Sequence, residues 1–325
     1  MRLLVTGGAG FIGSNFIRYW IKTHPKDHIT NLDALTYAGC KKTIEDFDSK
    51  HHTFIHGSIC DQSTVHKAME DIETIVHFAA ESHVDRSIQQ SQIFLQTNVL
   101  GTHTLLEEAR KRGNQIQRFH HISTDEVFGS LGLREERKFD EDSRYNPHNP
   151  YSASKAASDH LCRAYFYTHG VPITISNCSN NYGPYQMPEK FIPTMIISAL
   201  RDKPLPVYGD GKNVRDWIHV EDHCRGIEAV LAKGKVGETY CLGANQEHAN
   251  ILVAKMILDI LKKPLSLLTF VEDRKGHDRR YAIDSAKARK RLNWKPVYGF
   301  EDGLRQTIEW YKANESWWKP LLSSK

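Results

Sequence analysis

The stretch VTGGAGFIGSNF (5–16) decides the fold. An apolar run at residues 2–6 leads directly into Gly7, Gly10 and Gly13, and a helical pattern begins immediately behind them. Glycines permit a tight turn and let backbone N–H groups come close to a bound pyrophosphate. The strand, turn and helix in this order predict a dinucleotide-binding unit.

A carboxylate follows at the spacing that such a unit requires. Asp33 ends the next apolar run, HITNLD (28–33), about 20 residues farther along the chain, where it can bind the ribose hydroxyls of the dinucleotide. Because an aspartate there repels a 2′-phosphate, NAD is favoured over NADP. The alternative is that the glycines only end a strand and that Asp33 is a solvated turn residue.

Short apolar runs alternate with amphipathic stretches over residues 2–125, which is the order of a parallel, doubly wound sheet. We expect helices at 98–112 and 151–169. The fold class is therefore α/β, a Rossmann-type doubly wound parallel sheet with a smaller C-terminal α/β domain. The expected strands are RLLVT (2–6), HITNLD (28–33), HTFIHG (52–57), TIVHFAA (74–80), FHHIST (119–124) and VPITISNC (171–178).

The regular alternation weakens after residue 175. The stretch NNYGPYQMPEKFIP (180–193) is rich in Gly, Pro, Asn and Tyr, which is typical of an ordered loop. We expect residues 1–175 to form the NAD-binding domain and residues 176–325 to form mainly the substrate-binding domain. Residues 211–245 are expected to return to the first domain.

The composition excludes several classes of protein. The 325 residues carry a net charge of +4 with acidic and basic residues interleaved, so a nucleic-acid partner is not expected. No apolar run is long enough to cross a bilayer, and the N-terminus lacks the zones of a signal peptide, so we expect a cytoplasmic protein without a membrane partner. Six scattered cysteines without a C-x-x-C pair indicate no metal site.

Hydroxyl and amine side chains suited to hydride transfer follow the fifth expected strand. In YSASK (151–155), Tyr151 and Lys155 share one helix face. An ammonium neighbour and a cationic nicotinamide would both stabilise a phenolate on Tyr151. The Y-x-x-x-K pattern alone occurs often by chance, but Thr124 ends a strand at the edge where ligands bind in such a sheet. Thr124 can then hydrogen-bond the hydroxyl that is oxidised.

The chain resembles the extended short-chain dehydrogenase/reductase superfamily. Within that superfamily it is similar to the nucleotide-sugar 4,6-dehydratases, of the dTDP-glucose 4,6-dehydratase type. The resemblance covers nearly the whole chain up to residue 300. It runs through TGGAGFIG, FAAESHVDRS, TNVLGT, STDEVFG, YSASK, NCSNNYGPYQMPEKFIP, VRDWIHVEDH and GHDRRYAID.

The resemblance gives Asp125 and Glu126, in STDEVFG (123–129), a reason to be adjacent. In this family the C4 hydroxyl of the sugar is oxidised, which acidifies the C5 proton; Glu126 would remove that proton, and Asp125 would protonate the departing C6 hydroxyl. The hydride then returns, which gives a 4-keto-6-deoxy sugar for deoxysugar biosynthesis. A buried pair of like charges favours opposite protonation states. The alternative is a helix N-terminus or a salt-bridged loop.

The resemblance also implies two sets of ligand-binding residues, with catalysis by Thr124, Asp125, Glu126, Tyr151 and Lys155. Arg215 and Arg274 suit a diphosphate because a guanidinium matches phosphate oxygens. The cofactor set is Gly7, Gly10, Phe11, Ile12, Gly13, Asp33, Ser58, Ile59, Ala79, Ala80, Asn98, Tyr151 and Lys155. The substrate set is His83, Thr124, Asn181, Lys190, Pro206, Tyr208, Arg215, Asn250, Arg274 and His277.

Two positions depart from the family pattern. Ser58 stands where an aspartate commonly lies near adenine, and Lys275 stands where proline is usual.

Two substrate residues have alternative roles. Tyr208 either stacks on a pyrimidine or fills the domain interface, and His83 either touches the sugar or supports its loop.

The sequence leaves the substrate and two alternative functions open. The substrate is a nucleoside-diphosphate sugar, either dTDP-glucose, UDP-glucose or UDP-N-acetylglucosamine, with or without inversion at C5. A nucleotide-sugar 4-epimerase and a non-catalytic NAD-binding protein are the alternative functions. The resemblance further implies a homodimer that pairs through the helices at 98–112 and 151–169.

Overall fold

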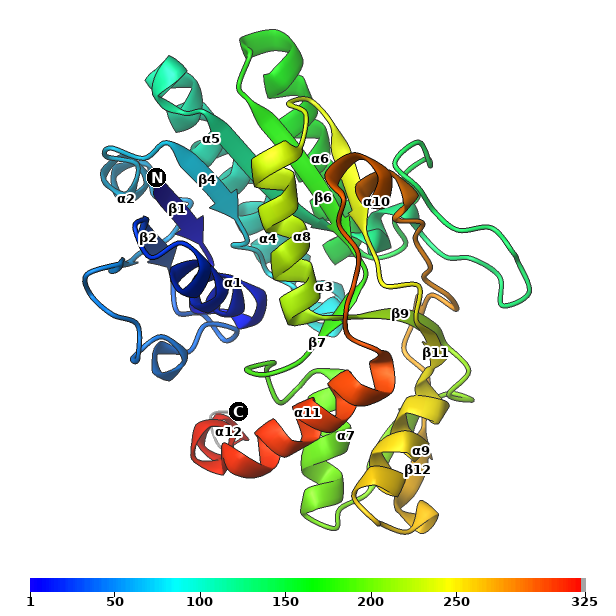
Figure 1. The fold of residues 1–325 in the computed structure, drawn as a ribbon. Coiled ribbons are helices and arrows are strands. Elements are labelled where there is room, and N and C mark those ends of the chain that lie inside the picture. Colours follow the sequence, from blue (N-terminus) through cyan, green and yellow to red (C-terminus); the bar gives the residue numbers. More distant parts are fainter. Residues whose placement is uncertain (323–325) are drawn as a thin grey trace.

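A seven-stranded parallel sheet forms the centre of the computed structural model, which describes residues 1–322 (Figure 1). The strand order is β10-β6-β5-β4-β1-β2-β3, and every neighbouring pair is parallel. The strands are β1 (Arg2–Thr6), β2 (His28–Asp33), β3 (His52–His56), β4 (Thr74–His77), β5 (Arg118–Thr124), β6 (Ile173–Cys178) and β10 (Thr239–Leu242).

The predicted Rossmann-type sheet is confirmed, and the first six strands lie where the sequence places them. Strand β1 pairs with β2 on one side and with β4 on the other, so the chain changes direction across the sheet after β3. In such sheets the crevice at this switch point, beyond the carboxyl ends of the strands, is where ligands bind.

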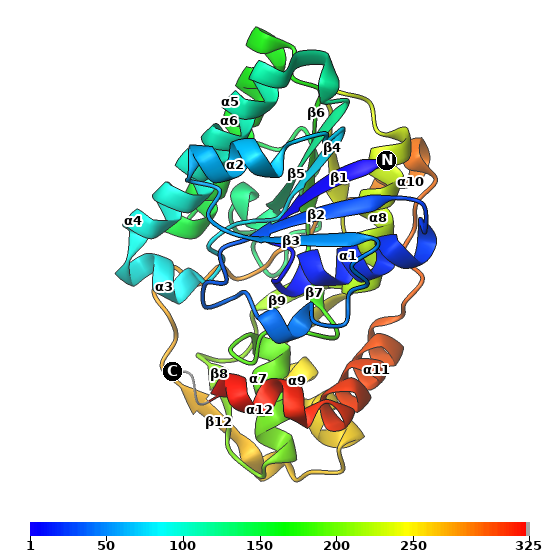
Figure 2. The same ribbon diagram turned by 90° about the vertical axis from the view of Figure 1, so that its left-hand side faces the viewer.

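Helices cover both faces of the sheet (Figure 2). Helices α1 (Phe11–Thr23), α8 (Val220–Lys233) and α10 (Ala286–Leu292) bury apolar side chains against one face, with Phe16 and Ile227 in a shared core. Helices α2 (Gln62–Ala68), α5 (Thr102–Arg112) and α6 (Pro150–His169) pack on the other face, where Leu105 and Cys162 are buried.

The two predicted long helices differ in how well their bounds agree with the sequence. Helix α6 begins at Pro150 behind a capping box from Asn149, and Gly170 ends it in a left-handed conformation. The predicted start of the other helix at Asn98 is wrong, because helical backbone already runs through α4 (Ser91–Phe94). A π-helical turn, η2 (Leu95–Gly101), then joins α4 to α5. Such turns are frequent at functional sites.

A second region lies below the carboxyl ends of the large sheet (Figure 2). Its core buries Tyr182, Trp217 and Tyr311. Residues 180–182 form a short strand there rather than a loop, because they pair with residues 217–219. The region contains strands β7 (Asn180–Tyr182), β8 (Leu205–Tyr208), β9 (Val214–His219), β11 (Glu247–Ala249) and β12 (Leu268–Val271), and helices α3 (Val84–Gln89), α7 (Phe191–Leu200), α9 (Asn250–Ile260), α11 (Phe300–Ala313) and α12 (Glu315–Leu322) border or build it.

The chain crosses between the two regions more than once. Strand β6 contains residues 175 and 176, and α8 and β10 lie with the large sheet although they follow parts of the second region. Within residues 1–322, no helix combines the length and the apolar character that crossing a bilayer requires.

Candidate active site

The glycine-rich loop leaves space where side chains would otherwise lie. Gly7 has φ +75°, and a Cβ on it would lie 2.7 Å from the backbone nitrogen of Ala79; a Cβ on Gly13 would lie 2.3 Å from the carbonyl oxygen of Gly7. Helix α1 begins at Phe11. Within the described residues, no side chain caps its N-terminus, and its first turn contains no acidic residue. Its N–H groups are therefore free for an anion, which fits the pyrophosphate of a dinucleotide.

Asp33 is fixed at the end of β2. Its Oδ2 accepts a hydrogen bond from the backbone N–H of Ala9 (2.9 Å), and its Oδ1 accepts one from Leu35 (2.7 Å). Burial raises the pKa of this carboxyl above its ordinary value. Asp33 is therefore not a solvated turn residue, and it ties the glycine-rich loop to the strand beside the cavity.

One cavity, here the cofactor cavity, brings together all the predicted cofactor residues except Asn98. Asn98 lies behind its wall: the side-chain amide donates to the carbonyl of Glu81 (3.0 Å) and to Ser154 (2.8 Å), and its oxygen accepts from the N–H of Glu81 (2.8 Å). Asn98 therefore positions Glu81, which does line the cavity. The predicted lining residues are Gly7, Gly10, Phe11, Ile12, Gly13, Asp33, Ser58, Ile59, Ala79, Ala80, Tyr151 and Lys155.

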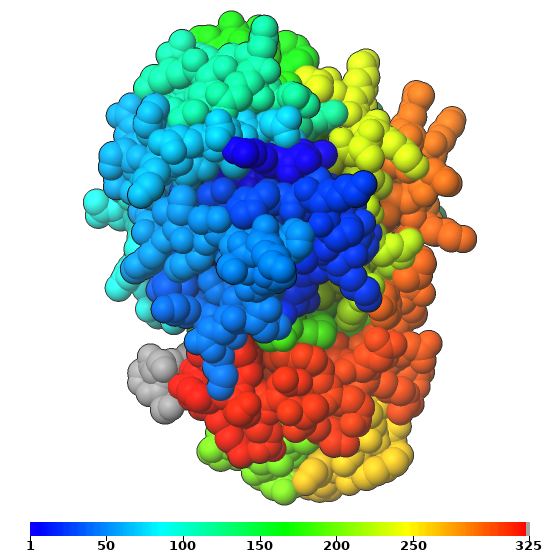
Figure 3. Space-filling view, turned by 60° about the vertical axis from the view of Figure 1, so that its left-hand side comes forward, coloured from blue at the N-terminus to red at the C-terminus, as the bar shows by residue number. Residues whose placement is uncertain are grey.

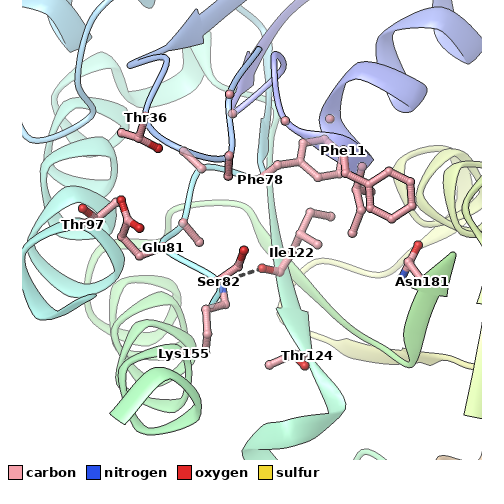
Figure 4. A pocket seen from close by; sticks show the side chains of 18 of the residues that line it. Phe11, Thr36, Phe78, Glu81, Ser82, Thr97, Ile122, Thr124, Lys155 and Asn181 are labelled. Atoms are coloured by element: carbon pink, nitrogen blue, oxygen red, sulfur yellow. Dashed lines mark hydrogen bonds between the residues drawn. The ribbon is translucent and has the colours of Figure 1, made fainter. Parts of the chain in front are cut away.

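Tyr151 and Lys155 both reach this cavity from α6. The ammonium of Lys155 donates to the carbonyl oxygen of Ile122 at 2.7 Å (Figure 4). Burial raises the pKa of Tyr151 well above its ordinary value, and the neighbouring charge of Glu126 raises it further. The protein's own groups therefore favour the neutral phenol, and Lys155 alone does not produce the lowered pKa that the sequence suggested. A cationic ligand beside the phenol would oppose this rise in its pKa.

A buried acid that the sequence argument missed lies behind Lys155. Asp159 accepts hydrogen bonds from Ser123 (2.8 Å) and Tyr145 (2.7 Å), and it contacts His121 at 3.2 Å. Burial alone would raise its pKa, but the bond to His121 and the charge of Lys155 hold the pKa below its ordinary value. Asp159 thus balances the buried ammonium. Its position four residues after Lys155 was a usable signal.

The adjacent carboxyls follow β5 in the short 3-10 helix η4 (Asp125–Phe128). The hydroxyl of Thr124 accepts a hydrogen bond from the N–H of Glu126 (3.3 Å) and so caps this turn. Asp125 is 1% exposed, and its Oδ2 has no hydrogen-bond partner among residues 1–322. A buried carboxyl oxygen without a partner is suited to hydrogen-bond a ligand.

The surroundings of Asp125 and Glu126 affect the pKa values of the two carboxyls differently. Burial raises the pKa of Asp125 well above its ordinary value, and the charges of Glu126 and Asp216 add to this rise. Burial also raises the pKa of Glu126, but three cations, Arg215, Arg274 and Lys190, oppose that rise. The surroundings of Asp125 therefore favour its protonated form, while the cations near Glu126 favour the ionised form of that side chain.

A second cavity, here the substrate cavity, adjoins the first and shares Glu126, Asn181 and Lys190 with it. Of the predicted substrate residues, Thr124 lines only the cofactor cavity. The others meet in the substrate cavity: His83, Asn181, Lys190, Pro206, Tyr208, Arg215, Asn250, Arg274 and His277.

These side chains differ in how many of their polar groups already have partners within the protein. The guanidinium of Arg215 is buried, lies 4.2 Å from the ring of Tyr281 and donates to the carbonyl of Asp278 (3.0 Å). Arg274 pairs with Asp85 on α3 at 3.6 Å, across the cavity. Tyr208 is 38% exposed, so it does not fill a domain interface.

Two side-chain amides also face the substrate cavity. Asn181 is held by His223 (2.9 Å) and by the carbonyl of Ser179 (2.9 Å). The Oδ1 of Asn250 is buried without a partner among residues 1–322, so it remains an acceptor for a ligand.

The possible metal ligands in the described part of the chain, the cysteines included, form no metal-binding cluster. In the part of the chain that the structure describes, no group of three or more His, Cys, Asp or Glu side chains is arranged to hold a metal ion.

The glycine-rich loop at the switch point of the sheet and the Tyr151–Lys155 pair at the same edge define the class of protein. They are the arrangement of an extended short-chain dehydrogenase/reductase, with the carboxyl pair added at the end of β5.

Comparison with known proteins defines the family. The family model described as GDP-mannose 4,6 dehydratase matches residues 4–307. The chain is 48% identical to the dTDP-glucose 4,6-dehydratase of Neisseria meningitidis, over 99% of this chain and 96% of that protein. It is likewise 48% identical to the dTDP-glucose 4,6-dehydratase of Mycobacterium tuberculosis, with the same coverage. The chain belongs to the nucleotide-sugar 4,6-dehydratase family, as the resemblance predicts.

Solved structures agree with this assignment. DesIV, a dTDP-glucose 4,6-dehydratase from Streptomyces venezuelae solved with NAD bound, has a TM-score of 0.95 and 46% identity, covering 99% of this chain and 100% of that one. A UDP-glucose 4-epimerase from Thermotoga maritima has a TM-score of 0.89 at 26% identity, covering 97% of this chain and 100% of that one.

The charge pattern around Glu126 predicts a specific change in pH dependence. Arg274→Gln removes a cation that lowers the pKa of Glu126, so the acidic limb of the kcat/KM profile moves to higher pH. The reason is that Glu126, the predicted base, can accept a proton only when it is ionised, and its pKa rises in the variant.

The matched control is Arg279→Gln, which removes an exposed guanidinium paired with Asp210 and should leave the limb in place. Steady-state kinetics across the pH range measure both profiles. A limb that stays in place or moves to lower pH in the Arg274 variant contradicts the role of this cation.

Proposed function

We propose that the protein converts dTDP-glucose to dTDP-4-keto-6-deoxyglucose, with the configuration at C5 retained. As a member of its family the chain is a nucleotide-sugar 4,6-dehydratase, a hydro-lyase, and its cofactor is NAD. The observation that carries the proposal is the unequal carboxyl pair where the two cavities meet. Burial and nearby carboxylates raise the pKa of Asp125 well above its ordinary value, whereas three cations oppose the rise in the pKa of Glu126.

The cofactor cavity supplies the parts for reversible oxidation at C4. Gly7, Gly13 and Asp33 would hold NAD, which, when bound, accepts a hydride from the sugar and later returns it. Tyr151 takes the proton of the C4 hydroxyl, and Thr124 hydrogen-bonds that hydroxyl. Lys155 donates to the carbonyl oxygen of Ile122, which holds it beside the reacting groups; burial lowers the pKa of its ammonium, and the charge of Asp159 opposes that effect.

The carboxyl pair then performs the elimination. A ketone at C4 acidifies the C5 proton, which Glu126 accepts. Asp125 donates its proton to the C6 hydroxyl, the C6–O bond breaks, and water leaves. The hydride removed from C4 would then be returned to C6, and Glu126 returns its proton to C5 on the face from which it came, which saturates the C5–C6 bond.

The substrate cavity is suited to the nucleotide part of the sugar donor. We assign Arg215, Lys190 and Arg274 to the diphosphate, because three cations converge there. Tyr208 is assigned to stack on the base, and Asn250 to accept a hydrogen bond from it. We further propose that residues 1–175, together with residues 211–245, form the cofactor domain and that the rest of residues 176–325 mainly hold the nucleotide. A cytoplasmic location stays a prediction.

A substrate panel tests the proposal. The NAD-loaded protein is incubated separately with dTDP-glucose, UDP-glucose and UDP-N-acetylglucosamine, and the products are examined by mass spectrometry and proton NMR. The proposal expects a product one water lighter, formed fastest from dTDP-glucose. An unchanged mass with inverted C4 indicates an epimerase, and no turnover of any substrate contradicts a dehydratase.

The division of labour between the carboxyls predicts an arrested reaction in one variant. Glu126→Gln keeps C4 oxidation possible but removes the base for C5, so kcat falls by about 10²- to 10⁴-fold and reduced cofactor accumulates on the enzyme. Absorbance of bound NADH after substrate addition measures this.

Glu135→Gln is the control, because Glu135 is an exposed carboxylate in the loop after η4. It should turn over at the wild-type rate. Unaltered turnover in the Glu126 variant would remove Glu126 as the base.

We also propose a homodimer. Large apolar side chains are exposed along residues 88–100, with Ile88 at 43%, Ile93 at 46%, and Leu95 and Leu100 each at 53%. Tyr167 on the neighbouring α6 is 79% exposed. Exposed apolar patches of this kind mark contact surfaces, and a second copy of the chain is the partner that the helical face suits.

The proposed interface predicts a change in mass in solution. Leu100→Asp places a charge in the apolar face and should shift the protein toward monomers in sedimentation velocity. Leu252→Asp, at a similarly exposed position on α9, should not. A wild-type protein that sediments as a monomer contradicts the dimer.

A further inference from the structure

The C-terminal helix α12 contacts a loop that lies far away in the sequence. The indole N–H of Trp317 donates to the hydroxyl of Thr43 at 3.0 Å, and both side chains are buried. The ammonium of Lys42 donates to the carbonyl of Ser316 at 2.7 Å. In Figure 3 the blue surface of the segment near residues 40–50 rests on the red surface of the C-terminal helices.

That loop, residues 34–50, closes one end of the cofactor cavity. It begins directly after Asp33, and Ala34, Thr36, Ala38 and Gly39 line the cavity. The N–H of Cys40 donates to the carbonyl of Ala9 in the glycine-rich loop at 3.0 Å. Loop 34–50 therefore covers the site beside Asp33, where the ribose of a dinucleotide would lie.

Trp317 also contacts the opposite side of the same cavity. Its ring meets the ring of Tyr185 edge-on, with centroids 5.6 Å apart. The next two residues after Tyr185, Gln186 and Met187, line the cofactor cavity. The phenol of Tyr311, on α11, donates to the carbonyl oxygen of Gln186. One side chain of α12 thus touches both walls of the cavity mouth.

Tyr185 needs its neighbours to keep its conformation. Its φ of +65° lies in the left-handed region, which a bulky residue rarely adopts. The ring is held by Trp310 at 4.6 Å and by the guanidinium of Arg18 at 4.4 Å.

Arg18 forms a second connection between the walls. Its guanidinium also lies 4.7 Å from the ring of Phe47 and donates to Asp46 (2.8 Å) and to the carbonyl of Thr43. It therefore joins loop 34–50 to Tyr185 in parallel with Trp317.

We propose that Trp317 and Thr43 form a clasp that retains NAD, and that the cofactor leaves only when this contact opens. The proposal goes beyond the reaction itself and rests on NAD being the cofactor. Since the hydride that NAD accepts is returned to the same sugar, turnover never requires its release, and slow release keeps the enzyme loaded. Trp317 and Thr43 are positioning residues, because they act through loop 34–50.

The test compares variants that each remove one hydrogen bond. Thr43→Val breaks this hydrogen bond with little change in volume, whereas Trp317→Phe breaks it and also replaces the indole by a smaller ring. The matched control is Trp318→Phe, which removes an indole bond of the same kind, to the carbonyl of Tyr311 (2.7 Å), from the same helix but away from loop 34–50. Released NAD is captured by an excess of an unrelated NAD-dependent dehydrogenase after the holoenzyme is diluted.

The clasp predicts that each of the two variants releases NAD about fivefold faster, as expected for the loss of one hydrogen bond of ordinary strength. The double variant should release it no faster than either single one, because both changes remove the same contact. Hydrogen exchange at amides 36–47 should rise in the clasp variants and stay unchanged in Trp318→Phe.

Wild-type release rates in the clasp variants overturn the proposal, as does an equal acceleration in Trp318→Phe. If Trp317→Phe does not fold, Thr43→Val alone decides between the outcomes. Neither readout involves the sugar substrate, so failure of the clasp is distinguishable from failure of the proposed reaction.

Discussion

Two neighbouring carboxyl groups in a buried site cannot both carry a charge at low cost, and the chemistry of this protein depends on that constraint. Asp125 is buried, and the charges of Glu126 and Asp216 add to the effect of burial, so the pKa of Asp125 is well above its ordinary value. Glu126 is turned toward Arg215, Arg274 and Lys190, which oppose the effect of burial. In the proposed reaction a single dipeptide thus supplies an acid and a base, although both side chains are carboxylic acids.

The fold places this pair beside the groups that we propose to oxidise C4. Strand β5 ends at Thr124, and α6 presents Tyr151 and Lys155 to the same edge of the sheet. The switch between β2 and β4 on either side of β1 opens the cofactor cavity there. The second region then closes the substrate cavity from below, so the oxidising and eliminating groups share one space around Glu126.

Much of this arrangement follows from local sequence patterns. The strands, the glycine cradle, Asp33 and the i, i+4 pair of Tyr151 and Lys155 all rest on short-range periodicity and spacing, and the structure places them accordingly. Each of these features is encoded within one strand, one turn or one helix.

Features that depend on distant parts of the chain could not be predicted. The pairing of Arg274 with Asp85 and the contact of Trp317 with Thr43 join segments that only the tertiary fold brings together. Asn98 lies in the TNVLGT motif, but its side chain, in the π-helical turn η2, hydrogen-bonds Glu81. The raised pKa of Tyr151 reflects burial, which spacing does not reveal.

The protonation states of the two carboxyls are the central claim, and carbon-13 NMR of selectively labelled aspartate and glutamate side chains tests them directly. Asp125→Asn and Glu126→Gln identify the two resonances. The account predicts that, at neutral pH, the Asp125 carboxyl carbon has the chemical shift of a protonated acid while that of Glu126 has the shift of a carboxylate. Two ionised carboxylates, or a protonated Glu126 beside an ionised Asp125, would contradict it.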